Sequence, residues 1–156
     1  MMESIRTVFT PSNVSFMMEG LKLALLISVG VVILSIIFGT VLGLLRNYEK
    51  KVFGKLAGAY IELFRNTPLL LWMLSCSFLI PGSTITLKGS FALFLYTSAV
   101  VAEIVRGGLN SIPKGQFEAG HSQGFSFMQT LRYIILPQAF KKIIPSLLSQ
   151  VITTIK

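Results

Sequence analysis

LALLISVGVVILSIIFGTVLGLL, residues 23–45, is a run of 23 residues without a charge, bounded by Lys22 and Arg46. A transmembrane helix needs about 20 predominantly apolar residues to cross a hydrocarbon core of about 30 Å. The stretch therefore predicts a membrane-spanning helix, placed at residues 21–45, and indicates that the chain is an integral membrane protein.

The composition of the whole chain agrees with this prediction. Hydrophobic residues make up 53% and charged residues 13%, against about 25% charged residues in an ordinary soluble domain. The mean hydropathy is +0.73. A net charge of +8 on a soluble protein would suggest nucleic acid as a partner, but here the basic residues lie at the ends of apolar runs, as they do in membrane proteins. We therefore expect membrane lipid, and no nucleic acid, around the chain.

Three further apolar segments follow the first. Two are predicted to be complete spans, at residues 56–80 and 89–108. The third, at residues 138–156, has only 13 uncharged residues between Lys142 and Lys156, or about 20 Å of helix. It is predicted to be an incomplete fourth span, and we expect the C-terminal helices of the domain to be missing. The predicted fold is an all-α integral membrane protein, a single transmembrane domain over residues 1–156.

The distribution of basic residues orients these spans. Residues 46–55 hold four basic side chains, the loop at residues 81–88 holds one, and residues 106–142 hold five. Because basic residues favour the cytoplasmic side, the first and third of these segments are predicted to be cytoplasmic and the second external. The N-terminus is then external, in a multi-pass protein of a cell membrane.

Two glycines within the first span, Gly39 and Gly43, form a G-x-x-x-G pattern. Such a pattern lets another helix approach closely. Glycine is also simply common in membrane helices, and the sequence does not decide between these two explanations.

Four charged residues lie inside the predicted spans as two Glu-x-x-Arg pairs, Glu62 with Arg65 and Glu103 with Arg106. The spacing places both members of a pair on one face of a helix, and a charge at the centre of a membrane costs about 2.5–3.5 kcal/mol or more. We therefore expect these side chains to pair, within a helix or between the two helices. The favoured interpretation is a structural clamp between the second and third spans, and the alternative is that they line or gate a translocation path.

The sequence Arg65-Asn-Thr67-Pro68 interrupts the second span. Proline cannot donate the backbone hydrogen bond of a helix interior, and broken helices with free backbone groups often mark binding sites in transporters. Thr67 and Pro68 are therefore candidates for the same path, although a plain kink is the simpler interpretation.

The segment at residues 111–137 is too polar to cross the membrane. We predict a short helix at residues 116–123 and a turn at Gly124, which readily takes the positive φ that ends a helix. A second helix is predicted to start at the cap Ser126 and to end at Leu136-Pro137. A helix as short as the first is marginal alone, so it should have a partner surface.

This segment resembles a known motif, the "EAA" loop of permeases in ATP-binding cassette importers. The family pattern is Glu-Ala-Ala, three residues, Gly, nine residues and Ile-x-Leu-Pro. The chain keeps this spacing and differs at one position, Gly120, where alanine is usual. The residues at the motif positions are Glu118, Ala119, Gly120, Gly124, Ile134, Leu136 and Pro137.

The flanking sequences resemble the polar amino-acid branch of those permeases, the glutamine and histidine type. They are EIVRGGLNSIPKGQ at residues 103–116 and ELFRNTPLL at residues 62–70, where glycine is usual in place of Asn66. The resemblance implies a multi-helix permease domain in a bacterial cell membrane, whose residues 118–124 form a coupling helix docked on a cytoplasmic ATPase subunit. It also implies an extracellular substrate-binding protein, a second permease copy, and import of glutamine, glutamate or a basic amino acid by alternating access.

Other function classes fit the sequence less well. The chain has one His, one Cys and no Asp, and His121 and Cys76 fall on opposite sides of the membrane in the predicted topology, so the clustered groups that catalysis needs are missing. The sequence has no phosphate-binding G-x-x-x-x-G-K-[ST], so ATP hydrolysis is expected on the partner subunit, and no cofactor or metal is expected. The remaining alternative is a truncated or non-transporting membrane scaffold.

Overall fold

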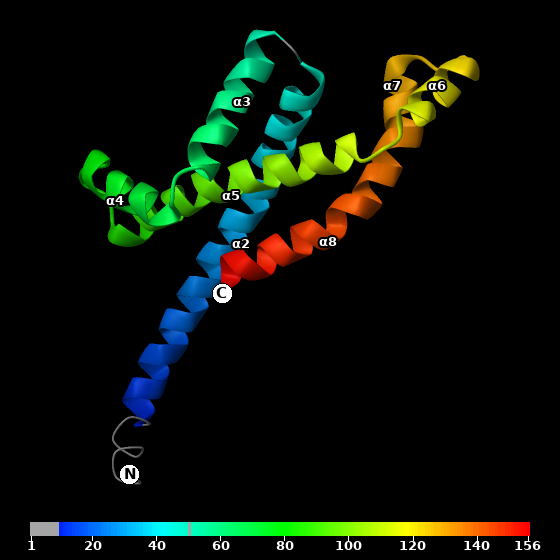
Figure 1. The fold of residues 1–156 in the computed structure, drawn as a ribbon. Helices are drawn as coiled ribbons and strands as arrows, with labels where there is room; N and C mark the ends of the chain where they lie inside the picture. The colour runs from blue at the N-terminus through cyan, green and yellow to red at the C-terminus, as the bar shows by residue number, and fades with distance from the viewer. Residues whose placement is uncertain (1–9, 50) are drawn as a thin grey trace.

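The computed structural model describes residues 10–49 and 51–156, and all regular secondary structure in that part of the chain is helical, which confirms the predicted all-α fold. Lys50, counted above in the first basic loop, and residues 1–9, predicted to be external, lie outside the described residues. The elements in chain order are α2 (Pro11–Tyr48), α3 (Val52–Arg65), α4 (Leu69–Leu79), α5 (Ile85–Asn110), α6 (Lys114–Ser122), α7 (Phe127–Thr130), a π-helical turn (Leu131–Ile135) and α8 (Leu136–Ile155) (Figure 1).

The helices α2 and α5 are long and apolar enough to cross a membrane, judged by length and composition. They have 38 and 26 residues, so they measure about 57 Å and 39 Å, against a hydrocarbon core of about 30 Å. The predicted spans at residues 21–45 and 89–108 lie within them.

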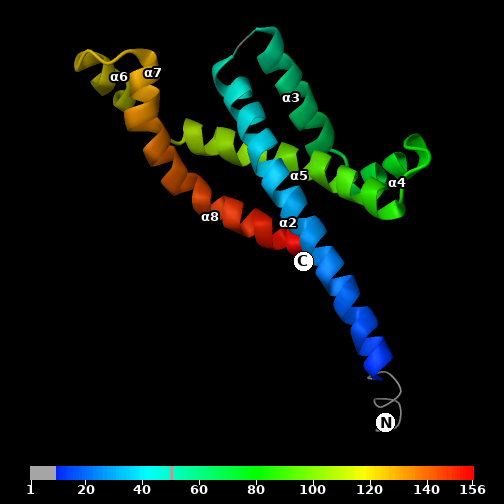
Figure 2. The same ribbon diagram turned by 180° about the vertical axis from the view of Figure 1, so that it is seen from behind.

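The helices α2 and α5 cross in close contact (Figures 1 and 2). At the crossing, Gly39 faces the Ser98 carbonyl and Val101, and one turn further along α2 Gly43 faces the Ala102 carbonyl and Val105. The G-x-x-x-G pattern is therefore a helix-packing pattern here.

The segment predicted as the second span, residues 56–80, is divided into α3 and α4. Pro68, between them, has a φ of −57° and a ψ of 138°, which is extended rather than helical. A proline ring excludes its residue from a helix interior and disfavours the helical conformation at the residue before it. The simpler interpretation, a plain kink, is therefore wrong: one helix ends at Arg65 and another of 11 residues, about 16 Å long, begins at Leu69.

The core of the molecule is built around α5. One cluster of buried side chains joins α5 to the π-helical turn and α8, and a second joins α5 to α2 and α3. The central position of α5 therefore links the first half of the chain to α8. The first cluster contains Val101, Val105, Leu109, Ile112, Leu131, Ile135, Ala139 and Ile143, and the second contains Leu42, Ala57, Ile61 and Ala102.

A single continuous helix runs from Phe127 to Ile155 through α7, the π-helical turn and α8 (Figure 1). The prediction that a helix ends at Leu136-Pro137 was wrong. The Leu136 amide donates to the Leu131 carbonyl, five residues earlier, so the turn directly before Pro137 is wider than an α-helical turn. The ring of a proline clashes with the carbonyl four residues earlier in a regular helix, and the wider turn gives Pro137 room. The predicted fourth span, residues 138–156, lies mostly within α8.

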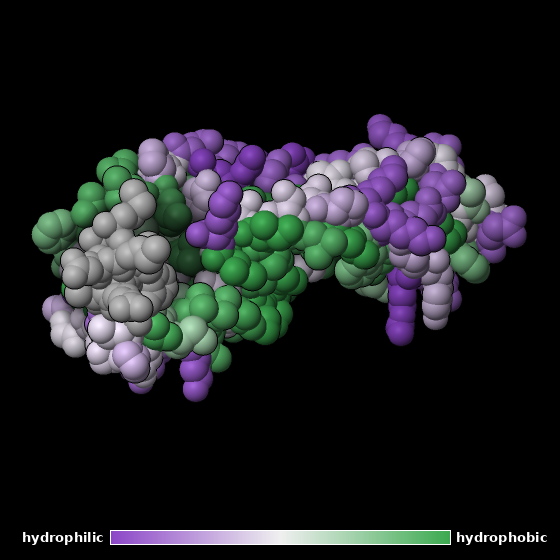
Figure 3. Space-filling model, turned by 90° about the horizontal axis from the view of Figure 1, so that it is seen from below, coloured by the Kyte–Doolittle hydropathy of each residue, from purple (hydrophilic) through white to green (hydrophobic). Residues whose placement is uncertain are grey.

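The two segments predicted to be cytoplasmic lie at the same end of the molecule. Figures 1 and 2 show the end of α2, the start of α3 and the α6–α7 segment at the top, while α2 extends downward towards its first residues. In Figure 3, hydrophobic residues cover the middle of the molecule and hydrophilic residues gather where α6 and α7 lie. Exposed large apolar side chains run along α2, α4 and the first turns of α5, as expected for helices surrounded by lipid or by other membrane helices.

Candidate functional site

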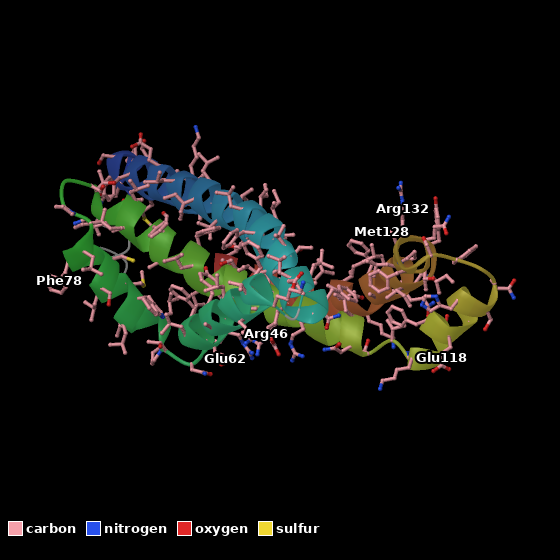
Figure 4. The ribbon with its side chains drawn as sticks, turned by 90° about the horizontal axis from the view of Figure 1, so that it is seen from above. Arg46, Glu62, Phe78, Glu118, Met128 and Arg132 are labelled. Atoms are coloured by element: carbon pink, nitrogen blue, oxygen red, sulfur yellow. The ribbon has the colours of Figure 1, made fainter. Side chains whose placement is uncertain are left out.

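The predicted short helix of the polar loop is confirmed as α6, with its bounds at Lys114 and Ser122. Pro113 precedes it with a φ of −58° and a ψ of 140°, so the chain turns sharply between the end of α5 and the start of α6. Figure 4 shows Glu118 on this helix at the opposite end of the molecule from Phe78 of α4. α6 is therefore held out from the body of the membrane-spanning helices.

The turn after α6 has the conformation expected from its sequence. Gly124 has a φ of +80°, the left-handed region that favours glycine. Ser126 then caps α7 in a capping box: its hydroxyl accepts from the Gln129 amide at 3.3 Å, and its own amide donates to the Gln129 side-chain oxygen at 2.8 Å. These two features define the angle at which the chain returns from α6 to α7.

The seven residues at the motif positions divide into exposed and packed ones. Glu118, Ala119, Gly124 and Pro137 are exposed, Ile134 and Leu136 are half-buried, and Gly120 is buried. Ile134 and Leu136 pack against the first core cluster. The exposed face of α6 is thus available to a partner, while the other end of the motif anchors the loop to the protein.

The strongest anchors of the loop are residues that the motif does not include. Leu131 is 9% exposed and Ile135 is fully buried, and both belong to the core cluster that continues with Ala139 and Ile143. Their spacing of four residues is the signal that could have identified them, since apolar residues at that interval share one face of a helix.

A second candidate site is an ion cluster centred on Glu103 of α5. Its carboxylate accepts from the Arg106 guanidinium at 2.5 and 3.0 Å, and it lies 3.7 Å from Arg46 of α2 and 3.6 Å from Arg65 of α3. Arg46 also pairs with Glu62 of α3 at 2.6 Å, and Figure 4 labels both residues close to one another. Five charged groups from three helices thus form one network.

The prediction that these charges pair within a helix or between the two helices is confirmed for three of the four residues, and Glu62 is the exception. Glu103 and Arg106 pair within α5, whereas Glu62 turns to Arg46 and Arg65 turns to Glu103. Arg46 was not identified from the sequence as a member of this cluster, because it lies directly after the uncharged run of the first span and was considered only as the boundary of that run. In residues 10–49 and 51–156, no group of three or more His, Cys, Asp or Glu side chains could hold a metal ion.

Thr67 and Pro68 lie at the junction between α3 and α4. The Thr67 hydroxyl donates to the Leu63 carbonyl at 2.9 Å, which provides a partner for a backbone group at the end of α3. Pro68 is exposed. The junction follows directly on Arg65, so the ion cluster and the helix break adjoin.

Comparison with known proteins shows a match over most of the chain. Residues 32–156 match the family described as "Binding-protein-dependent transport system inner membrane component". The chain is 36% identical over 152 residues to the probable glutamine ABC transporter permease protein GlnP of Bacillus subtilis, covering 95% of this chain and 70% of that protein. It is also 36% identical over 152 residues to the arginine transport system permease protein ArtQ of the same organism, covering 94% and 69%.

A solved structure has the same fold. It is described as an amino acid ABC transporter with histidines, and it superposes with a TM-score of 0.77 at 31% identity, covering 92% of this chain and 71% of that one. The arrangement of α2 to α8 is therefore similar to that of a chain in a solved amino acid ABC transporter.

Proposed function

This chain belongs to the family of inner membrane components of binding-protein-dependent transport systems, and from this premise we propose that it carries a polar amino acid into the cell. It is a permease subunit of an ATP-binding cassette importer, and such importers work with an ATPase subunit and a substrate-binding protein. ATP is hydrolysed on the separate ATPase subunit, and this chain contributes to the passage through the inner membrane.

The observation that carries the proposed mechanism is the exposed face of α6. Glu118 and Ala119 are exposed on a nine-residue helix that is too short to be stable alone and that projects from the body of the protein. We therefore assign α6 as the coupling helix, which docks on the ATPase. Closure of the ATPase dimer moves α6, and the membrane-spanning helices then alternate between inward-facing and outward-facing arrangements.

The orientation of the chain follows from the same assignment. The end of α2, the start of α3 and the helix α6 lie at one end of the molecule (Figure 1), and basic residues that favour the cytoplasm lie there, among them Arg46, Lys51 and Lys114. The N-terminus is then external, on the side of the substrate-binding protein. A second permease copy, identical or related, completes the passage.

The ion cluster is assigned first as a clamp. Glu103 joins α2, α3 and α5 at the cytoplasmic end, and its side chain is 22% exposed. Arg65 is 43% exposed and adjoins the helix break at Thr67 and Pro68, so this part of the cluster is the candidate for the translocation path.

The substrate class is tested by uptake in cells that carry the complete importer. The relatives are named for glutamine and arginine, so we expect labelled glutamine or glutamate to accumulate first and basic amino acids next. Unlabelled glutamine should compete and a sugar should not. Accumulation of a sugar or a metal ion alone would contradict the proposed substrate class.

The docking role of α6 is tested by reversing a charge on its exposed face. We expect Glu118→Lys to lower the amount of ATPase subunit that co-purifies with this chain by at least about tenfold, because unfavourable charge juxtaposition at an interface costs several kcal/mol and about 1.4 kcal/mol is already a factor of ten. Gly124→Ala, which strains the turn after α6 because alanine disfavours a positive φ, should act in the same direction.

The matched control is Glu19→Lys. It is the same charge reversal on an exposed residue near the N-terminal end of α2, away from α6. It should leave co-purification unchanged, and all variants should reach the membrane in equal amounts. Equal ATPase binding by Glu118→Lys and Glu19→Lys would show that α6 is not the docking helix.

A further inference from the structure

The coupling helix α6 is attached to the long helix at residues 127–155 at two separate places. One attachment is a steric contact between Gly120 and Thr130, and the other is a hydrogen bond between Gln116 and Gln138. The two contacts lie on consecutive turns of α6, since Gln116 and Gly120 are four residues apart and share one face of the helix.

The first attachment depends on the absence of a side chain at Gly120. A Cβ atom at this position would lie 2.6 Å from the Thr130 methyl carbon and 2.7 Å from its hydroxyl oxygen, well inside contact distance. Thr130 is fully buried, and its hydroxyl oxygen has no hydrogen-bond partner among the described residues. Thr130 therefore acts by filling space against the backbone of α6.

The backbone of Gly120 also holds the turn that follows α6. Its carbonyl accepts from the Phe125 amide at 3.0 Å and from the Gln123 amide at 3.2 Å. Gly120 thus both contacts Thr130 and accepts the hydrogen bonds of the turn. The positions of the turn and of α6 therefore depend on the same contact.

The second attachment is polar. The Gln138 side-chain amide donates to the Gln116 side-chain oxygen at 2.9 Å and to the Ile134 carbonyl at 3.0 Å. Both glutamines are half-buried. Ile134 belongs to the π-helical turn, so Gln138 ties α6 to the point where the long helix widens.

We propose that Thr130 and Gln138 are positioning residues that fix α6 on the long helix, so that a displacement of α6 is passed directly to α8. This inference rests on the proposed docking role of α6. The helix α8 continues from α7 through the π-helical turn without a break. Because α6 is held on this long helix at two points, α6 and the long helix move as one body. If either contact is lost, α6 moves relative to α8 and part of the displacement is not transmitted.

The proposal also explains the one departure from the family motif. Alanine is usual at position 120, and here a Cβ would collide with Thr130. Glycine at 120 and threonine at 130 are therefore sterically matched in this chain.

The test compares Gly120→Ala, Thr130→Ala and the double variant in the complete importer. Two quantities are measured for each: the ATPase subunit that co-purifies, and the substrate transported per ATP hydrolysed. Transport per ATP hydrolysed is a ratio that reports on the complexes that have formed, and Gly120→Ala should lower it by about tenfold because the collision with Thr130 shifts α6 on the long helix. The double variant should return to the level of Thr130→Ala, because alanine at 130 removes both colliding atoms.

A second variant tests the polar attachment without changing the glycine. Gln138→Leu keeps a side chain of similar size and removes the hydrogen bond, and it should lower transport per ATP by about threefold at unchanged co-purification. A purely structural role would lower the amount of protein in the membrane and leave transport per ATP unchanged.

The results separate this inference from the proposed function. If Glu118→Lys loses the ATPase while Gly120→Ala and Gln138→Leu transport like wild type, the positioning role is wrong and the docking role stands. A double variant no better than Gly120→Ala would also overturn the pairing of residues 120 and 130. If Glu118→Lys keeps the ATPase, the docking role itself is wrong.

Discussion

Gly39→Val is expected to remove most of the folded protein from the membrane. A Cβ at Gly39 would lie 2.6 Å from the Ser98 carbonyl oxygen and 2.8 Å from Val101. The first of these is a backbone atom of the central helix, which cannot move aside as a flexible side chain can. The helices α2 and α5 would have to separate along their crossing, at a cost of about 3 kcal/mol or more for overpacking.

The same substitution at Gly30 is the matched control. Gly30 lies on the same helix, and nothing lies within 4 Å of a Cβ there, so Gly30→Val should change the free energy of unfolding by about 0.5 kcal/mol or less. The measurement is the yield of monodisperse protein and its thermal unfolding midpoint in detergent. Equal loss in the two variants would mean that the glycines matter to α2 alone and not to its contact with α5.

Glu103→Gln is the second substitution expected to have a large effect. Three arginines from three helices lie within 4 Å of this carboxylate, and glutamine keeps its size while removing the charge. Breaking a fully buried ion pair by removing one partner costs about 3–5 kcal/mol. Because Glu103 is 22% exposed, solvent screens part of this, and we expect a loss of about 2–3 kcal/mol in the free energy of unfolding.

Glu62→Gln provides the comparison within the same cluster. Glu62 pairs with Arg46, but its side chain is 63% exposed, so its ion pair should be worth about 0.5 kcal/mol or less. Thermal unfolding of the two variants, with transport measured alongside, distinguishes the clamp from the path. A stable Glu103→Gln protein that no longer transports would favour a path-lining role for the cluster over the clamp.

Local sequence patterns were sufficient to predict the features whose conformation depends on residues close together in the chain. The membrane-spanning character of α2 follows from its uncharged run, and the turn at Gly124 and the cap at Ser126 follow from the conformations that these residues favour. The prediction failed at Pro137, where the rule that proline ends a helix was overridden by a wider turn placed just before it.

The pairing of charges shows where local patterns stop being informative. Two identical Glu-x-x-Arg segments pair in different ways, because the surroundings of α3 and α5 differ and not because their spacing differs. Arg46 could not be assigned from the sequence, since its partners lie 16 and 57 residues away along the chain, at Glu62 and Glu103.

The membrane-spanning class of the chain, the short helix α6, its closing turn and the family motif could all be read from local sequence, because hydropathy, glycine conformation and helix capping act over a few residues. The packed helices were needed to see that Gly39 and Gly43 pack against α5, that Glu103 joins three helices, and that Thr130 and Gln138 contact α6 from the long helix. Each of these contacts joins atoms from different helices, and its geometry exists only once those helices have packed together.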